Sequence, residues 1–158
     1  APEKTAAELL HDRVAAGVEP APERTEPSAH MKGVMAFHQV YGHPVNRFPT
    51  TRGVTKKTGA LRVRLIREKL TELRDAIAAD DVVEIADALG DLLYVVTGAA
   101  LVYGIDLDAV FDEVQRSNMS KLGADGRPVV REDGKILKGP NFTEPDIRGV
   151  LDNQRPLF

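Results

Sequence analysis

The sequence contains no cysteine and no tryptophan among its 158 residues, and only 5% of its residues are aromatic. The absence of cysteine excludes disulfide bonds, thiolate metal sites and cysteine nucleophiles, and it fits a cytoplasmic location. The net charge is −3, whereas a protein that binds nucleic acid in general is usually basic. We therefore expect a small-molecule substrate and no stable complex with nucleic acid.

Long apolar runs are also scarce. The longest one, from Leu92 to Ile105, contains glycine and threonine and is shorter than the roughly 20 residues that a membrane span requires. The sequence thus favours a buried core helix, no association with membrane and no secretory signal. Apolar residues make up 42% of the chain, which predicts a folded domain with a real core.

Apolar residues that recur at helical spacing predict an all-α fold. The expected helices cover residues 3–16, 31–41, 60–79, 82–103 and 107–119. Residues 18–29 and 43–59 are rich in turn-forming residues and are expected to be a linker and a loop, and the end of the chain is expected to be irregular.

The predicted domain organisation follows from these elements. Residues 1–30 form an N-terminal helical extension and linker, and residues 31–158 form one globular domain. Within that domain, the pair Asp133-Gly134 predicts a β-hairpin, because it favours a tight turn between short apolar strands. The hairpin would serve as a small cover on the C-terminal side of the helices.

Two acidic segments are the most informative feature of the chain. Glu68 and Glu72 lie on the helix over 60–79, and Glu84, Asp87 and Asp91 form one stripe of the apolar helix over 82–103. Ionised carboxylates are costly to bury without a partner, and two facing rows would repel each other. Because Mg²⁺ takes carboxylate oxygens, the pattern indicates a metal-dependent enzyme that acts on a phosphate. A stripe that simply faces solvent is the alternative.

The helix over 60–79 also has an expected inner face. Its apolar residues are Leu61, Leu65, Ile66, Leu70, Leu73 and Ile77. At 100° per residue, Arg62 and Lys69 are predicted to point inward beside Leu73, so a lysine is expected close to the acids.

Five segments carry a resemblance to a known family. They are EKLTEL (68–73), DALGDLLY (87–94), GIDLDAVF (104–111), EVQRSNMSK (113–121) and DGKILKGPNF (133–142). On these segments the chain resembles the all-α nucleotide pyrophosphatases, the MazG-like group that includes dimeric dUTPases and phosphoribosyl-ATP pyrophosphohydrolases. The resemblance implies a core of the four-helix-bundle type and assembly into a homodimer or homotetramer.

The resemblance also implies an activity. The chain would be a nucleoside triphosphate pyrophosphohydrolase that depends on Mg²⁺ or Mn²⁺ and releases pyrophosphate from dUTP or a non-standard nucleotide, in a housecleaning role. By position, Glu72 and Asp91 match metal-binding acids of the family, whereas Lys69 and Ala88 stand where the family has glutamates.

Neighbouring acids offer replacements for the two missing glutamates. Glu68 and Asp87 each lie one residue earlier, and Glu84 forms a second Glu-x-x-Asp pair with Asp87. The predicted metal ligands are therefore Glu68, Glu72, Glu84, Asp87 and Asp91. Glu68 or Glu72 is the expected general base.

Five residues are predicted to contact the substrate, namely Lys69, Asn118, Lys121, Lys135 and Lys138. For Lys121 the alternative is an interaction with the dipole of the last helix, and for the two hairpin lysines it is a solvated surface.

Two other functions remain open. Lys69 favours a nucleotide sensor or a helical interaction module that has lost catalysis. A di-iron protein is less compatible with the sequence, because such sites use Glu-x-x-His pairs and the acidic helices contain no histidine.

Overall fold

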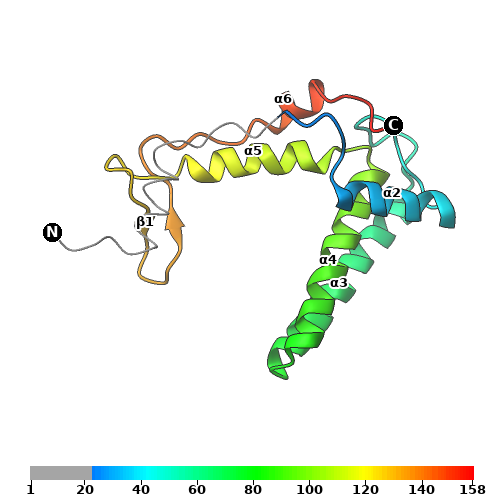
Figure 1. Cartoon of the computed structure of the whole chain (residues 1–158), viewed down its shortest axis with the longest axis horizontal. Coiled ribbons are helices and arrows are strands. Elements are labelled where there is room, and N and C mark those ends of the chain that lie inside the picture. The colour runs from blue at the N-terminus through cyan, green and yellow to red at the C-terminus, as the bar shows by residue number, and fades with distance from the viewer. Residues whose placement is uncertain (1–22) are drawn as a thin grey trace. The chain divides into compact units, whose positions relative to one another are not determined.

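The structure is a computed structural model that describes residues 23–158 (Figure 1). These residues form five helices and one two-stranded sheet, which confirms the predicted all-α class. The chain divides into two compact units. The larger unit comprises residues 25–109 and 148–158, and the smaller unit comprises residues 110–147 with residues 23 and 24. The helix expected over 3–16 lies outside the described residues, and the domain division at residue 30 stays a prediction.

Helix α2 spans Ala29–Tyr41 and confirms the helix predicted over 31–41. It begins at Ser28, whose hydroxyl accepts a hydrogen bond from the backbone N–H of Met31 at 3.3 Å. It ends at Gly42, which has a φ of 71°. Glycine adopts this left-handed conformation at little cost, so both helix ends follow from local sequence.

Helix α3 spans Lys56–Ala78, so it begins earlier than the predicted start at residue 60. Thr55 caps it, because its hydroxyl accepts a hydrogen bond from the backbone N–H of Thr58 at 3.1 Å. The loop expected over 43–59 is therefore wrong at its C-terminal end. The threonine cap outweighs the glycine at position 59, which lies inside the first turns of the helix.

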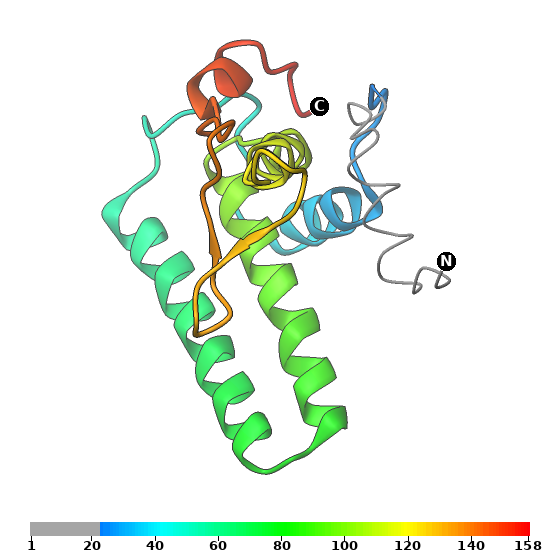
Figure 2. The same ribbon diagram turned by 90° about the vertical axis from the view of Figure 1, so that its left-hand side faces the viewer.

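Helix α4 spans Val82–Val102 and runs back along α3 (Figure 2). Asp81 caps it by accepting hydrogen bonds from the backbone N–H groups of Val83 and Glu84, at 3.0 and 3.2 Å. Asp80, with a φ of 54°, completes the predicted tight connection between the two helices. The acidic segments thus face each other on one helical hairpin.

The best-packed apolar core lies where α4 ends, away from the α3–α4 connection. It consists of Met31, Val34, Leu101 and Leu157. The end of the chain is held there, because the N–H of Leu157 donates to the carbonyl of Arg47 at 2.9 Å. Each such side chain contributes roughly 1.5–3 kcal/mol when fully buried. In the acidic half of the hairpin, by contrast, the buried apolar residues are two alanines, Ala76 and Ala88.

The hairpin itself is less buried than its sequence predicts. On α3, the expected inner residues Leu70 and Ile77 are 56% and 55% exposed. On α4, Ala88 is the one buried residue before Thr97. Helix α4 is also the one helix among residues 23–158 that is long and apolar enough to cross a membrane. That is weak evidence, because a core helix passes the same test, and the expected lack of membrane association stays a prediction.

The next elements are one helix and a short β-hairpin. Helix α5 spans Leu107–Met119 as predicted, and its cap Asp106 accepts hydrogen bonds from the N–H groups of Asp108 and Ala109 at 3.1 and 3.3 Å. Strands β1 (Val129–Val130) and β2 (Ile136–Leu137) pair antiparallel and confirm the predicted hairpin.

The prolines near the end of the chain led us to expect an irregular segment there, but part of this segment is helical. Helix α6 spans Ile147–Asp152 and follows Pro145. Proline favours the position just before or at the first turn of a helix, so this residue is compatible with a helix start as well as with a loop.

Candidate functional site

Lys69 lies between the two acidic segments. Its Nζ is 3.1 Å from Oε2 of Glu72 on the same helix and 3.0 Å from Oδ2 of Asp91 on α4. The lysine side chain is 24% exposed, whereas the carboxylate side chains are 47% and 43% exposed. The prediction that Lys69 points inward is confirmed, and its ammonium joins the two helices through their acids.

This arrangement fixes the charge of the lysine. Hydrogen bonds to Asp91 and, second, to Glu72 raise the pKa of Lys69 well above its ordinary value. Ion pairs this exposed contribute only about 0.2–1 kcal/mol each. The main consequence is therefore electrostatic, because Lys69 neutralises part of the negative charge of both carboxylates.

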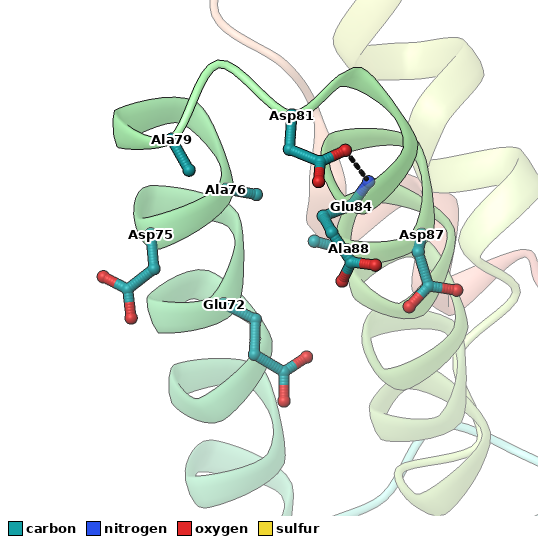
Figure 3. A pocket seen from close by; sticks show the side chains of 8 residues that line it. All are labelled: Glu72, Asp75, Ala76, Ala79, Asp81, Glu84, Asp87 and Ala88. Atoms are coloured by element: carbon teal, nitrogen blue, oxygen red, sulfur yellow. Dashed lines mark hydrogen bonds between the residues drawn. The ribbon is translucent and has the colours of Figure 1, made fainter.

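A pocket of about 350 Å³ opens beside this ion pair, toward the α3–α4 connection (Figure 3). Five carboxylates and three alanines line it, and none of the lining residues is basic. The acids are Glu72, Asp75, Asp81, Glu84 and Asp87. Small alanines on both helices leave the space open between the acidic side chains.

The acids of the pocket differ in orientation and in availability. Figure 3 shows Glu72 directed from α3 toward α4, which carries Glu84 and Asp87, while Asp75 points away from α4. Asp81 is engaged as the cap of α4. The structure thus brings three of the predicted ligands, Glu72, Glu84 and Asp87, to one pocket.

The other two predicted ligands lie beside this pocket. Asp91 pairs with Lys69, as described above. Glu68 is exposed one helical turn before Glu72 and has no hydrogen bond or ion pair with any residue of the described chain. It is therefore the free carboxylate of the α3 segment.

The candidate ligands are all carboxylates, and carboxylate oxygens are the type of ligand that Mg²⁺ prefers. Within residues 23–158, however, no group of three or more Asp, Glu or His side chains is arranged to hold a metal ion. Mg²⁺ commonly uses one or two carboxylates and completes its shell with water and substrate phosphates. The open acidic pocket matches that mode of binding and not a cage made by the protein alone.

The other four residues that the sequence predicts to contact the substrate all belong to the smaller unit. Lys138 pairs with Glu144 at 2.6 Å and lies 4.4 Å from the centre of the Phe142 ring. Lys135 is exposed, and Asn118 and Lys121 lie at the end of α5 and just beyond it. Their roles toward a substrate stay predictions.

A buried polar cluster received no functional role from the sequence. Arg62 is 5% exposed, its Nε has no hydrogen-bond partner, and its Nη2 lies 3.4 Å from Nδ1 of His43. His38 is 2% exposed and donates from Nδ1 to the carbonyl of Pro44 at 3.1 Å. Burial lowers the pKa of both Arg62 and His38. The predicted inward direction of Arg62 was the one sequence signal for this cluster.

Comparisons with known proteins extend these observations. The sequence profile described as phosphoribosyl-ATP pyrophosphohydrolase matches residues 34–118, a range that contains both acidic helices. An uncharacterized protein of Acanthamoeba polyphaga mimivirus is 38% identical over 132 residues, which cover 81% of this chain and 50% of that protein. The chain therefore spans about half the length of this curated relative.

A solved structure is also similar. A candidate NTP pyrophosphohydrolase from Exiguobacterium sp. 255-15 is 25% identical to this chain, with a TM-score of 0.42. The match covers 78% of this chain and 92% of that one.

Proposed function

The chain belongs to the phosphoribosyl-ATP pyrophosphohydrolase family, and we propose that it hydrolyses the triphosphate of a nucleotide and releases pyrophosphate. One observation carries the proposal. Glu72 of α3 and Glu84 and Asp87 of α4 line one open pocket, and both helices lie inside the region that matches the family. The proposed substrates are dUTP or another non-standard nucleoside triphosphate, which would make the activity a housecleaning one.

The charge of the pocket supports a substrate that brings a cation with it. Five acids and no base line the pocket, so a free polyphosphate would be repelled. A nucleotide complexed with Mg²⁺ removes this repulsion. Glu84 and Asp87 are the residues that would hold the ion together with the phosphates, because the other pocket acids pair with a basic side chain or cap a helix. When bound, Mg²⁺ would neutralise phosphate charge and polarise the attacking water.

The chain's own residues would perform two further tasks. Glu68 is the best-placed general base, because it lies one turn from Glu72 and its carboxylate is free of protein partners in the described residues. Lys69 would hold Glu72 and Asp91 in place and would keep the two helices at a fixed spacing. Binding would thereby position the triphosphate along the acidic face of the hairpin.

The test is a nucleotide panel assayed for pyrophosphate. Purified protein would be incubated with dUTP, the common nucleoside triphosphates and phosphoribosyl-ATP in the presence of Mg²⁺, with EDTA-treated samples as the control. We expect release from at least one substrate and its loss in EDTA. If no nucleotide yields pyrophosphate with Mg²⁺ or Mn²⁺, the proposed activity is wrong.

Lys69 also favours a second candidate function, a nucleotide sensor without turnover. The lysine holds Glu72 and Asp91, two acids that would otherwise be free to bind a cation. Calorimetry combined with product analysis separates the two functions. A sensor binds nucleotide and returns it intact, whereas a single substrate with sustained turnover rules the sensor out.

A further inference from the structure

The ion pairs of Lys69 have a consequence for how many cations this site can hold. Nζ lies 3.0 Å from one oxygen of Asp91, and it lies 3.3 and 3.1 Å from the two oxygens of Glu72. A magnesium ion shared by these carboxylates would need to approach each oxygen to about 2.0–2.1 Å. It would therefore have to enter the space beside the ammonium and meet its positive charge at short range.

On α4, the position that faces Glu72 across the pocket offers no ligand that could compensate for this repulsion. Ala88 is 2% exposed and lines the pocket beside Glu72, but its methyl group cannot coordinate a cation. The carboxylates of Glu84 and Asp87 lie further toward the α3–α4 connection, on the side of the pocket that Lys69 does not occupy. The hairpin thus divides into a part neutralised by a side chain and a part that remains acidic.

We propose that the Lys69 ammonium is a built-in cation that takes the place of a divalent ion between Glu72 and Asp91. The site consequently holds a single divalent ion, on its Glu84 and Asp87 side, where substrate phosphates complete the shell. The inference refines the proposed function and rests on it for the identity of the substrate, but the binding of metal can be measured without any substrate.

The experiment uses the full chain without nucleotide and Mn²⁺ as the probe. Calorimetry and the electron paramagnetic resonance of free Mn²⁺ would give the affinity and the number of ions bound per chain. We expect K69E to bind Mn²⁺ at least about tenfold more tightly than the wild type, or to bind one additional ion, because a repulsive charge becomes a ligand. K69R retains the cation and should bind Mn²⁺ as the wild type does.

K57E is the matched control. Lys57 lies on the first turn of α3, so the substitution changes the net charge by the same amount far along the helix from Asp91. If K57E and K69E tighten Mn²⁺ binding equally, the effect comes from the net charge of the chain and not from the position of Lys69. That result would overturn the proposal. So would identical Mn²⁺ binding by the wild type and K69E, or two Mn²⁺ ions bound per chain of the wild type.

K69Q covers the case in which K69E does not fold, as judged by circular dichroism. Removal of the ammonium alone should tighten Mn²⁺ binding, and unchanged binding in a folded K69Q would also overturn the proposal. These outcomes are independent of turnover. A chain that shows the expected Mn²⁺ binding but releases no pyrophosphate contradicts the proposed function and leaves the role of Lys69 standing.

Discussion

Gly98 and His38 meet where α4 crosses α2. A Cβ atom at Gly98 would lie 2.9 Å from Nε2 of His38 and 3.4 Å from Nη1 of Arg62. Real Cβ atoms essentially never come as close as the first distance. The glycine therefore lets two buried polar side chains pack directly against the backbone of α4, at positions where they are 2% and 5% exposed.

Gly98→Ala is expected to lower the free energy of unfolding by about 1–3 kcal/mol, because the added methyl group has to displace the buried His38 ring. Urea denaturation followed by circular dichroism measures the change. Gly90→Ala is the matched control on the same helix, since nothing lies within 4 Å of its added Cβ. That substitution should stabilise the protein by about 0.5–1 kcal/mol. Equal effects at the two positions would contradict the close packing at Gly98.

The sequence predicts the elements whose signals are local. Ser28, Asp81 and Asp106 cap their helices through contacts with residues two or three positions away, and these ends are found close to where they were expected. The start of α3 was missed although Thr55 carries the same kind of signal, because Gly59 and the neighbouring threonines favoured a loop.

The site could be predicted only in part, because some of its contacts join residues that are far apart in the sequence. Helical periodicity places Lys69 and Glu72 on one face, and this much was correct. The partner of Lys69 is Asp91, which lies on the other helix, so the pairing depends on the register of α3 against α4. Burial was overestimated at Leu70 and Ile77, because periodicity identifies an apolar stripe but not the surface that covers it.

Asp91→Asn is expected to reduce pyrophosphate release by at least about tenfold while the protein remains folded. The amide loses the negative charge that holds Lys69, and the freed ammonium can then pair elsewhere in the acidic pocket. Steady-state kinetics with the best substrate of the nucleotide panel would measure the effect. Asp80→Asn is the control, because asparagine tolerates the positive φ of 54° at that exposed connection. Retained activity in Asp91→Asn would remove Asp91 from the site.

Glu113 is expected to remain ionised far below the usual range of a glutamate. The Arg116 guanidinium and, second, the backbone N–H of Asp146 hold the pKa of Glu113 at about 2, against an ordinary value of 4.5. A carboxyl group whose pKa is lowered by folding stabilises the fold above its unfolded pKa. This contribution is lost as the pH falls from about 4.5 to about 2.

Carbon-13 NMR of the side-chain carboxyl groups would follow this titration directly. Glu113→Gln should remove the part of the acid sensitivity that comes from this residue, and Glu132→Gln, at an exposed position of the β-hairpin turn, should leave it unchanged. A Glu113 carboxyl that titrates near 4.5 would show that its bonds to Arg116 and Asp146 are not maintained in solution.

The exposed apolar residues of the α3–α4 hairpin predict assembly with a second copy of the chain. They form one stripe on each helix at a spacing of seven residues, with exposures between 38% and 74%: Val63, Leu70 and Ile77 on α3, and Val82, Leu89 and Val96 on α4. Apolar stripes at this spacing pack well against another helix pair. Analytical ultracentrifugation should therefore show a dimer or tetramer, and Leu70→Glu should shift it toward smaller species. Thr71→Glu places the same charge at the adjacent exposed position and should not. A wild-type chain that sediments as a monomer at tens of micromolar would show that these stripes are simply solvated.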